Sequence, residues 1–270
     1  MTFEKWQALG NDYVILEEDV LPFPLTPERI VKLCAPHTGV GSDGVLLLGR
    51  TDQPGYVARL RIFNPDGSEA ELSGNGAREA VLYLRSNDWT QSDTFSIETA
   101  AGEMRPTITG PATCTMDMGR ARLAGEGELE AAGRTWRYRA LTVGNPQCAI
   151  RVDDPGALDL AEIGPPIERH ERFPERTNVS FWTERGPGAI RARIFERGVG
   201  ETLASGTGAS GAAVAYVLAG GDSPVTVTLD GGELAVEVED DLHVNLTGWA
   251  VPVYRGELAD EFIEELHATG

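Results

Sequence analysis

The chain has 270 residues, with 23 Lys or Arg against 42 Asp or Glu, which gives a formal net charge of −19 at pH 7. This charge repels nucleic acid and anionic membrane surfaces, so neither is expected as a partner. No apolar signal region opens the chain, and the longest apolar run, residues 212–219, is too short to span a bilayer, so we expect a soluble cytoplasmic protein.

Short strands and a few helices are predicted along the chain, separated by Gly, Pro and Asp turns. In chain order we expect a strand at Tyr13–Leu16, a helix at Thr26–Cys34, strands at Val45–Leu48 and Leu60–Phe63, a helix at Ala77–Asn87, strands at Cys114–Met118 and Ala149–Val152, a short helix at Leu158–Glu162, a strand at Ile190–Phe195, a helix at Ala209–Ala219, strands at Val225–Leu229 and Leu234–Val238, and an acidic helix at Glu257–His267. Polar segments at 125–132 and 151–172 are expected to be loops or connections. The pattern predicts an α/β (α+β) fold with mostly antiparallel or mixed sheet wrapped around a central helix.

One stretch of sequence occurs twice. Arg61 to Ala77 (RIFNPDGSEAELSGNGA) returns 132 residues later as Arg193 to Ala209 (RIFERGVGETLASGTGA), and eight of the seventeen positions are identical. Two copies at this spacing predict two pseudo-symmetric halves and exclude a solenoid of short repeats. We expect an N-terminal half, residues 1–117 completed by the tail 252–270, and a C-terminal half, residues 118–251, with the active-site cleft between them.

Each copy joins a Gly-rich turn to an Ala-rich apolar run, SGNGAREAVLYL from Ser73 and SGTGASGAAVAYVL from Ser205. A helix that starts in such a turn leaves its first backbone N–H groups without intrahelical partners at the positive end of its dipole. One such turn is typical of ordinary capping, whereas a matched pair favours an anion held between two helix starts. The N–H groups of Gly74-Asn75 and Gly206-Thr207 are therefore candidate carboxylate ligands.

Cysteine, histidine and lysine usage excludes several kinds of site. Cys34, Cys114 and Cys148 are widely spaced and odd in number, so they form neither a disulfide framework nor a zinc pattern and are expected to be buried thiols. The four histidines show no ligand spacing, so no metal is expected. Only Lys5 and Lys32 are present, and neither lies in a candidate motif, so no pyridoxal phosphate is expected.

Six motifs together resemble those of the diaminopimelate epimerase family. They are GND at Gly10–Asp12, GVGSDG at Gly39–Gly44, FNPDGSEAELSGNGAR at Phe63–Arg78, GNPQC at Gly144–Cys148, NVSF at Asn178–Phe181 and ERGVGETLASGTGA at Glu196–Ala209. The resemblance runs from Phe3 to about Val253 and implies two α/β halves, each a mixed sheet around a central helix. It also implies a cofactor-independent isomerase that interconverts LL- and meso-2,6-diaminopimelate in lysine and cell-wall precursor synthesis. The implied partner is a small amino-acid substrate, and a homodimer is kept open.

The resemblance also assigns roles to residues of this chain. It gives substrate contacts to four asparagines and places a Glu-Arg pair at the centre of the pocket, with the arginine on the distal carboxylate: Asn11, Asn64, Asn145, Asn178, Glu196 and Arg197. The residue types agree, because guanidinium binds carboxylate in a bidentate manner and asparagine amides suit a zwitterion. Taken singly, Asn beside Gly is typical of turns. The repeated Glu69 and Glu201 are interpreted as structural hydrogen-bond acceptors.

The chain departs from the family at the residues that transfer protons. Inversion of an amino-acid centre needs one acid–base group on each face of the carbon, and the resemblance implies cysteines where this chain has Ser73 and Ser205. A serine hydroxyl needs a neighbouring base to act in this way. In addition, Gln147, a candidate substrate contact, replaces the histidine of the usual GNPH motif, and Gly44 replaces a common glutamine.

Three interpretations of these departures stay open. Laboratory replacement of cysteine by serine explains Ser73 and Ser205 but not Gln147 and Gly44. In the leading interpretation, a natural branch of the family uses both serines, assisted by nearby carboxylates, with Glu196 as the candidate. The third is a superfamily relative with another isomerase activity, similar to the phenazine-biosynthesis-type isomerases, or an amino-acid-binding protein without catalysis.

Overall fold

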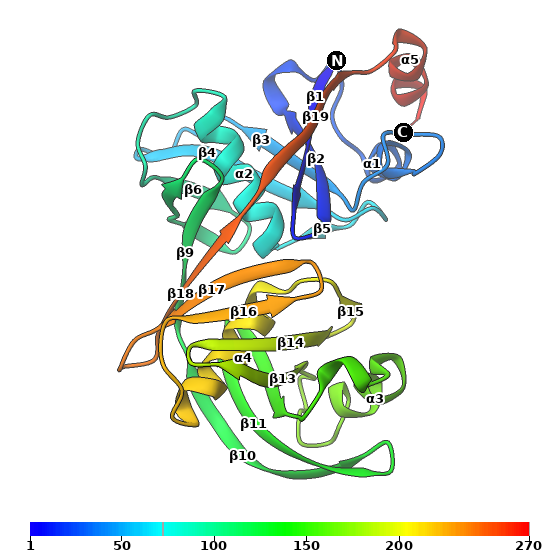
Figure 1. Cartoon of the computed structure of the whole chain (residues 1–270). Helices are drawn as coiled ribbons and strands as arrows, with labels where there is room; N and C mark the ends of the chain where they lie inside the picture. Colours follow the sequence, from blue (N-terminus) through cyan, green and yellow to red (C-terminus); the bar gives the residue numbers. More distant parts are fainter. Residues whose placement is uncertain (72, 270) are drawn as a thin grey trace. The chain divides into compact units, whose positions relative to one another are not determined.

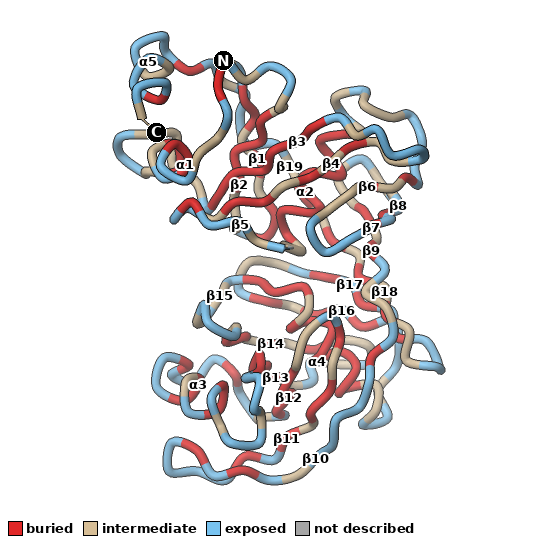
Figure 2. The backbone as a smooth tube through the Cα atoms, turned by 180° about the vertical axis from the view of Figure 1, so that it is seen from behind, coloured by how far each residue is buried: buried red, intermediate tan, exposed pale blue. Residues whose placement is uncertain are grey.

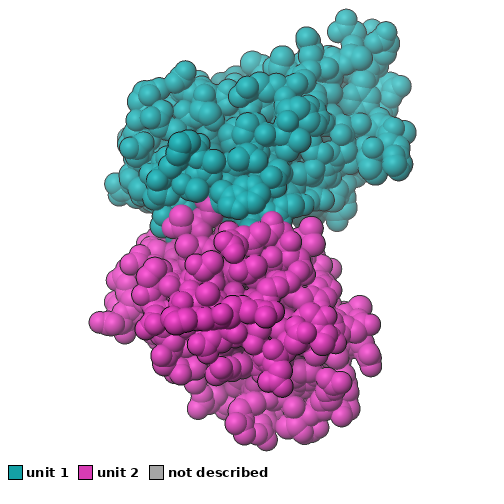
Figure 3. Space-filling view, in the orientation of Figure 1, with its two compact units in different colours: residues 1–116, 249–270 teal, residues 117–248 magenta. Residues whose placement is uncertain are grey.

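The computed structural model describes residues 1–71 and 73–269. The chain divides into two compact units, residues 1–116 with 249–270 and residues 117–248 (Figure 3). Each unit contains a sheet and one long buried helix, as the duplicated sequence predicts (Figure 1). Within the described residues, no helix has both the length and the apolar character needed to cross a membrane.

In the first unit an eight-stranded sheet runs in the order β19-β1-β2-β3-β4-β6-β7, with β5 paired to β4. The strands are β1 (Thr2–Ala8), β2 (Asn11–Glu17), β3 (Val45–Gly49), β4 (Tyr56–Phe63), β5 (Glu69–Ala70), β6 (Ser96–Thr99), β7 (Gly102–Met104) and β19 (Val251–Glu257). β8 (Thr107–Gly110) and β9 (Thr113–Arg120) form a hairpin. Because β2 pairs with β3 and β4 with β6 in parallel, the sheet is mixed.

Alternate residues of these strands pack against helices on the two faces of the first sheet. The helices of this unit are α1 (Pro27–Cys34), α2 (Gly74–Ser86) and α5 (Asp260–Ala268), with a 3₁₀ turn η1 (Glu18–Val20). Val14 and Leu16 pack with α1, whereas Tyr13 and Leu46 lie next to α2 at Gly76, so successive side chains point to opposite faces. A Cβ at Gly76 would come within 3.0 Å of Leu46 and 3.3 Å of Tyr13, so glycine here allows close packing of α2.

The second sheet follows the order β10-β11-β12-β13-β14-β16-β17-β18-β9-β8, so it ends in the β8–β9 hairpin, and β15 pairs with β14. The strands are β10 (Arg122–Ala131), β11 (Arg134–Val143), β12 (Asn145–Arg151), β13 (Asn178–Gly186), β14 (Ala189–Glu196), β15 (Gly200–Thr202), β16 (Val225–Leu229), β17 (Gly232–Val238) and β18 (His243–Trp249). The helices are α3 (Leu160–Glu168), α4 (Gly206–Leu218) and the 3₁₀ turn η2 (Pro155–Ala157).

α4 is the central helix of the second unit. It contacts β11, β12, β13, β14, β16 and β17, and Figure 2 shows it buried among these strands. Its sequence is apolar on every side, which is the pattern of a helix that the fold encloses completely. The sheet therefore fixes the start of α4, where the repeated Gly-rich turn lies.

Two expectations about polar segments were wrong. Residues 125–132, expected as a loop, lie mostly in β10, an edge strand whose exposed side chains form cross-strand pairs, Glu126 with Arg139 and Glu128 with Arg137. Residues 151–172, expected as connections with a short helix at 158–162, contain α3, which starts at Leu160 and runs to Glu168. Asp159 caps α3 by accepting from the N–H groups of Ala161 and Glu162.

The two central helices begin three residues earlier than the sequence analysis places them. α2 starts at Gly74 and α4 at Gly206, so each Gly-rich segment is the first helical turn and no separate turn precedes it. Serine is a strong N-cap, and Ser73 and Ser205 take that position. The remaining expected strands and helices occur within the observed elements or overlap them.

Candidate functional site

Ser73 and Ser205 cap their helices with the same geometry. Their backbones are extended, with φ −130° and ψ 121° at Ser73 and φ −140° and ψ 121° at Ser205. Each Oγ accepts a hydrogen bond from the third helical N–H, from Gly76 at 3.1 Å and from Gly208 at 3.2 Å. The cap uses the third N–H and leaves the first two of each helix available for another acceptor.

Gly74, the first residue of α2, has no packing reason to be glycine. Among the described residues, a Cβ at this position would meet only Arg78 Nη1, at 4.0 Å, and the φ of Gly74 lies outside the left-handed region. A glycine in open space lets a ligand approach the backbone N–H closely. The start of α2 thus has the features of an anion-binding turn.

Ser205 has a carboxylate beside it. Its hydroxyl donates to Glu196 Oε2 at 2.9 Å, and Thr202 donates to the other carboxylate oxygen at 2.8 Å. Burial raises the pKa of Glu196, and the hydrogen bonds from Thr202 and Ser205 oppose the shift. A partly buried carboxylate with a raised pKa is a stronger base than an ordinary glutamate, so this pair supplies the base that a serine needs.

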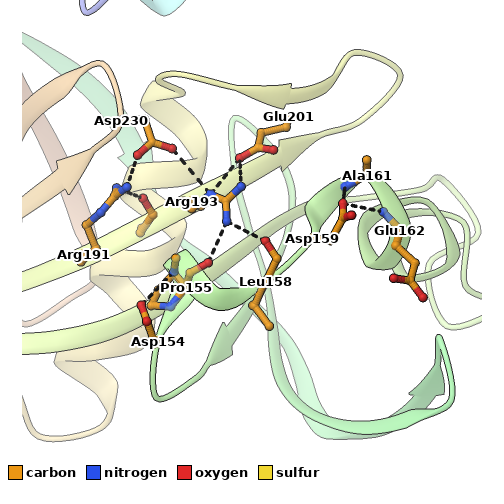
Figure 4. A network of polar contacts seen from close by, with 12 residues as sticks. Asp154, Pro155, Leu158, Asp159, Ala161, Glu162, Arg191, Arg193, Glu201 and Asp230 are labelled. Carbon is orange, nitrogen blue, oxygen red and sulfur yellow. Dashed lines mark hydrogen bonds and ion pairs between the residues drawn. The ribbon is translucent and has the colours of Figure 1, made fainter.

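An ion-pair network holds β14, the strand that ends in Glu196 (Figure 4). Arg193 donates from Nε to Glu201 at 2.8 Å and from Nη1 to the carbonyl oxygens of Pro155 and Leu158, both at 2.8 Å. Arg193 also lies 3.6 Å from Asp230. β14, β15 and η2 are therefore tied together next to the Ser205 pair.

The first unit has the equivalent ion pair. Arg61 donates to both carboxylate oxygens of Glu69, at 2.9 and 2.8 Å. The repeated Glu69 and Glu201 thus accept hydrogen bonds from the repeated Arg61 and Arg193, so the interpretation of these glutamates as structural acceptors is confirmed.

Asn178 joins a polar cluster at the start of α4. Its Oδ1 accepts from the Arg197 backbone N–H at 2.7 Å, and its Nδ2 donates to Asn145 Oδ1 and Thr207 Oγ1, both at 3.4 Å. Gln147 also donates to Asn145 Oδ1, from a fully buried position. Five candidate residues are therefore brought together: Asn145, Gln147, Asn178, Arg197 and Thr207.

The Arg197 side chain is exposed, and its Nη1 donates to the carbonyl oxygen of Glu175 at 3.1 Å. The next residue is anchored, because Gly198 donates its N–H to the buried Glu168 at 3.1 Å. A fixed backbone with an exposed guanidinium suits an arginine that receives a carboxylate from solution.

The first unit has a second polar cluster at the start of α2. Arg78, which is fully buried, donates to Asn75 Oδ1, and Asn75 Nδ2 donates to Asn11 Oδ1 at 3.3 Å. Asn11 Nδ2 in turn donates to Asp43 Oδ2 at 2.8 Å. These contacts orient both amides beside the Ser73 turn. Tyr13 lies at the same turn, with its hydroxyl 3.2 Å from Ser73 Oγ.

Asn64 sits in a local turn. Its Nδ2 donates to Ser68 Oγ at 2.9 Å, and its backbone accepts from Gly67 at 3.0 Å. Asn64 occupies the repeat position that Glu196 occupies in the second unit. The contacts of Asn64 therefore match the turn interpretation, and its proposed substrate contact stays a prediction.

Sequence reasoning missed the polar residues that support the candidates: Tyr13, Asp43, Arg78 and Thr202. Tyr13 had a visible signal, because it directly follows the GND motif, and Gly44 was already recognised as unusual. Arg78 and Thr202 lie within the motifs at Phe63–Arg78 and Glu196–Ala209, but nothing in those motifs indicates that Arg78 bonds to Asn75 or Thr202 to Glu196.

The three cysteines are buried and free, as expected. Burial raises the pKa of each thiol, that of Cys114 to about 12. Their thiolates are therefore scarce near neutral pH. Among residues 1–71 and 73–269, no cluster of three or more His, Cys, Asp or Glu side chains could hold a metal ion.

Comparison with known proteins agrees with the motifs. The family model described as diaminopimelate epimerase matches residues 3–124 and 139–253. The chain is 40% identical over 276 residues to a diaminopimelate epimerase of Synechococcus elongatus, covering 96% of this chain and 98% of that protein. It is 39% identical over 272 residues to that of Thioalkalivibrio sulfidiphilus, covering 95% and 98%.

Solved structures with low sequence identity share the fold. A PhzF-family phenazine biosynthesis protein of Bacillus anthracis superposes with a TM-score of 0.70 at 16% identity, covering 96% of this chain and 99% of that one. A hydroxyproline epimerase of Agrobacterium vitis gives 0.67 at 16% identity, covering 96% and 90%.

Proposed function

The chain belongs to the diaminopimelate epimerase family, and we propose that it interconverts LL- and meso-2,6-diaminopimelate with serines as its proton-transfer groups. The single observation that carries this proposal is the 2.9 Å hydrogen bond from Ser205 to Glu196. A serine in place of the family's cysteine needs a neighbouring base to transfer a proton, and the Glu196 carboxylate is that base.

In the proposed step Ser205 Oγ takes the α-proton of the substrate while its own proton moves to the Glu196 carboxylate. On the opposite face, Ser73 donates its hydroxyl proton to the α-carbon. The negative charge that develops on the substrate carboxylate is stabilised by the free N–H groups of Gly74-Asn75 and Gly206-Thr207, as in an oxyanion hole. The raised pKa of Glu196 supports its role as acceptor.

The far end of the substrate is assigned to the second unit. The exposed guanidinium of Arg197 binds the distal carboxylate, and the amides of Asn145, Gln147 and Asn178 bind the distal amino-acid group. Asn11 and Asn64 are further proposed contacts from the first unit. The proposal also includes a cytoplasmic location and a homodimer. Sedimentation of the purified chain tests whether it is a dimer.

Incubation with LL-diaminopimelate in D₂O tests the activity. We expect the meso isomer to form, with deuterium at its α-carbon. NMR measures the deuterium, and chiral chromatography separates the isomers. Glu184→Gln, which changes an exposed carboxylate paired with Arg151, serves as a matched control for Glu196→Gln. Binding of the amino acid without exchange or inversion would instead identify a binding protein, and turnover only of a different amino acid would identify another isomerase.

A further inference from the structure

Gly44 is glycine because the Phe63 backbone and the Tyr13 ring leave no room for a side chain beside it. A Cβ at Gly44 would lie 2.6 Å from Tyr13 Cε1 and 2.2 Å from the carbonyl oxygen of Phe63, and its φ lies outside the left-handed region. Packing therefore requires glycine here, whereas backbone conformation does not. The Tyr13 ring therefore packs directly against the Gly44 backbone.

The tyrosine ring is held on two sides. Gly44 borders one edge, and on the other edge a Cβ at Gly76 would lie 3.3 Å from Cε2. The side chain is only 5% exposed. Since a Tyr side chain has few rotatable bonds, this packing fixes the hydroxyl, which donates to Ser73 Oγ at 3.2 Å.

The hydrogen bonds of Ser73 and Ser205 have opposite directions. Ser205 donates a hydrogen bond to Glu196, whereas Ser73 Oγ accepts from both Tyr13 and the Gly76 N–H. With two donors on its oxygen, Ser73 keeps its own proton available for a third group. The oxygen is also better able to carry negative charge once that proton has left.

We propose that Tyr13 positions Ser73 and supplies the proton that Ser73 gives up; this inference rests on the proposed function. When the Ser73 O–H bond breaks, its proton forms the new Cα–H bond, and the phenolic proton of Tyr13 moves to Ser73 Oγ. The charge balances, because Glu196 gains one proton through Ser205 while Tyr13 loses one. Exchange with water restores both groups before the next turnover.

Tyr13→Phe tests the proposal because it keeps the ring between Gly44 and Gly76 and removes only the hydroxyl. The full chain is incubated in D₂O with the LL and the meso isomers separately, and α-deuterium is measured in unreacted substrate and in product. Tyr83→Phe is the matched control, since Tyr83 lies on α2, the helix that Ser73 caps, and the change removes a hydroxyl that donates to Glu17 of β2. Thermal unfolding checks that all variants fold.

We expect Tyr13→Phe to slow inversion in both directions by about tenfold or more. Deuterium should still enter the isomer whose α-proton faces Ser205, without inversion, while its entry into the other isomer falls. Glu196→Gln should reverse this preference. Equal loss of exchange from both isomers, or unchanged inversion in Tyr13→Phe, would overturn the role of Tyr13 while the activity stands. A wild-type chain with neither exchange nor inversion would overturn both proposals.

Discussion

The starts of α2 and α4 share one backbone design and differ in their chemistry. Each begins with a serine cap in extended conformation, followed by Gly-Xaa-Gly. Ser205 donates to a carboxylate, whereas Ser73 accepts from a phenol. The duplication preserved the helix start, and residues outside the glycine turn set the direction of each hydrogen bond.

The interiors of α2 and α4 also differ, in the residues at matching repeat positions. α2 carries Arg78 and Glu79, both fully buried, at the repeat positions where α4 has Ser210 and Gly211. In the second unit, a Cβ at Gly211 would lie 3.0 Å from Gln147, so that glutamine packs directly against α4. A buried arginine thus supports the first helix start, through its hydrogen bonds to Gly74 and Asn75, and a neutral amide packs beside the second.

Among the variants that distinguish Ser205 from Ser73, Glu196→Gln is expected to have the largest effect on the rate of inversion. It removes the base beside Ser205 and leaves Ser73 untouched, so inversion should fall by about 10²–10⁴-fold, the usual contribution of general base catalysis. Steady-state kinetics with both isomers measures this. A loss of the same size in Glu184→Gln would show that the effect is not specific to the pair.

Arg197→Ala should weaken binding of a dicarboxylate more than that of a monocarboxylate. A charge-assisted hydrogen bond contributes about 1.5–3 kcal/mol, so diaminopimelate should bind roughly 10–150-fold more weakly, since 1.4 kcal/mol is a factor of ten. Lysine, which lacks the distal carboxylate, should change little. Calorimetric titration that finds equal weakening for both ligands would reverse the assigned orientation.

The double variant Ser73→Cys with Ser205→Cys should raise inversion by about tenfold or more. A helix N-terminus lowers a cysteine pKa to between roughly 3.5 and 7.5, so thiolate is present at working pH. The gain in turnover should be accompanied by weaker dependence on Glu196, measured by adding Glu196→Gln. A folded double variant without epimerisation or exchange would mean that the pocket serves another reaction.

A smaller effect, on stability, is expected from the buried Glu79 of the first unit. Burial raises the pKa of Glu79 well above its usual range, although Arg78 opposes the shift. The folded chain therefore binds a proton that the unfolded chain has lost, and the free energy of unfolding falls as pH rises above about 4.3, the ordinary glutamate value. Glu79→Gln should melt a few degrees higher than wild type above pH 7, with no gain near pH 4. Calorimetry showing a gain that does not depend on pH would contradict this.

Local sequence signals predicted the two central helices and the inner strands, because their apolar runs are long and their glycines mark the turns. They failed at β10, where only Leu129 and Ala131 are buried and cross-strand ion pairs replace the apolar pattern. At the site, sequence identified Ser205 and Glu196 as candidates. The contact of Tyr13 with Ser73 could not be predicted, since the two are 60 residues apart in sequence and meet only because β2 packs against α2.

The pH dependence of α-deuterium incorporation from D₂O, compared between wild type and Glu196→Gln, tests the serine–carboxylate pair most directly. Glu196 must be ionised to accept the Ser205 proton, so the wild-type rate should fall as pH drops through a pKa above the ordinary value of about 4.3. The variant should be slow throughout and lack this acid limb. A variant that keeps both the wild-type rate and the same acid limb would show that Glu196 is not the base.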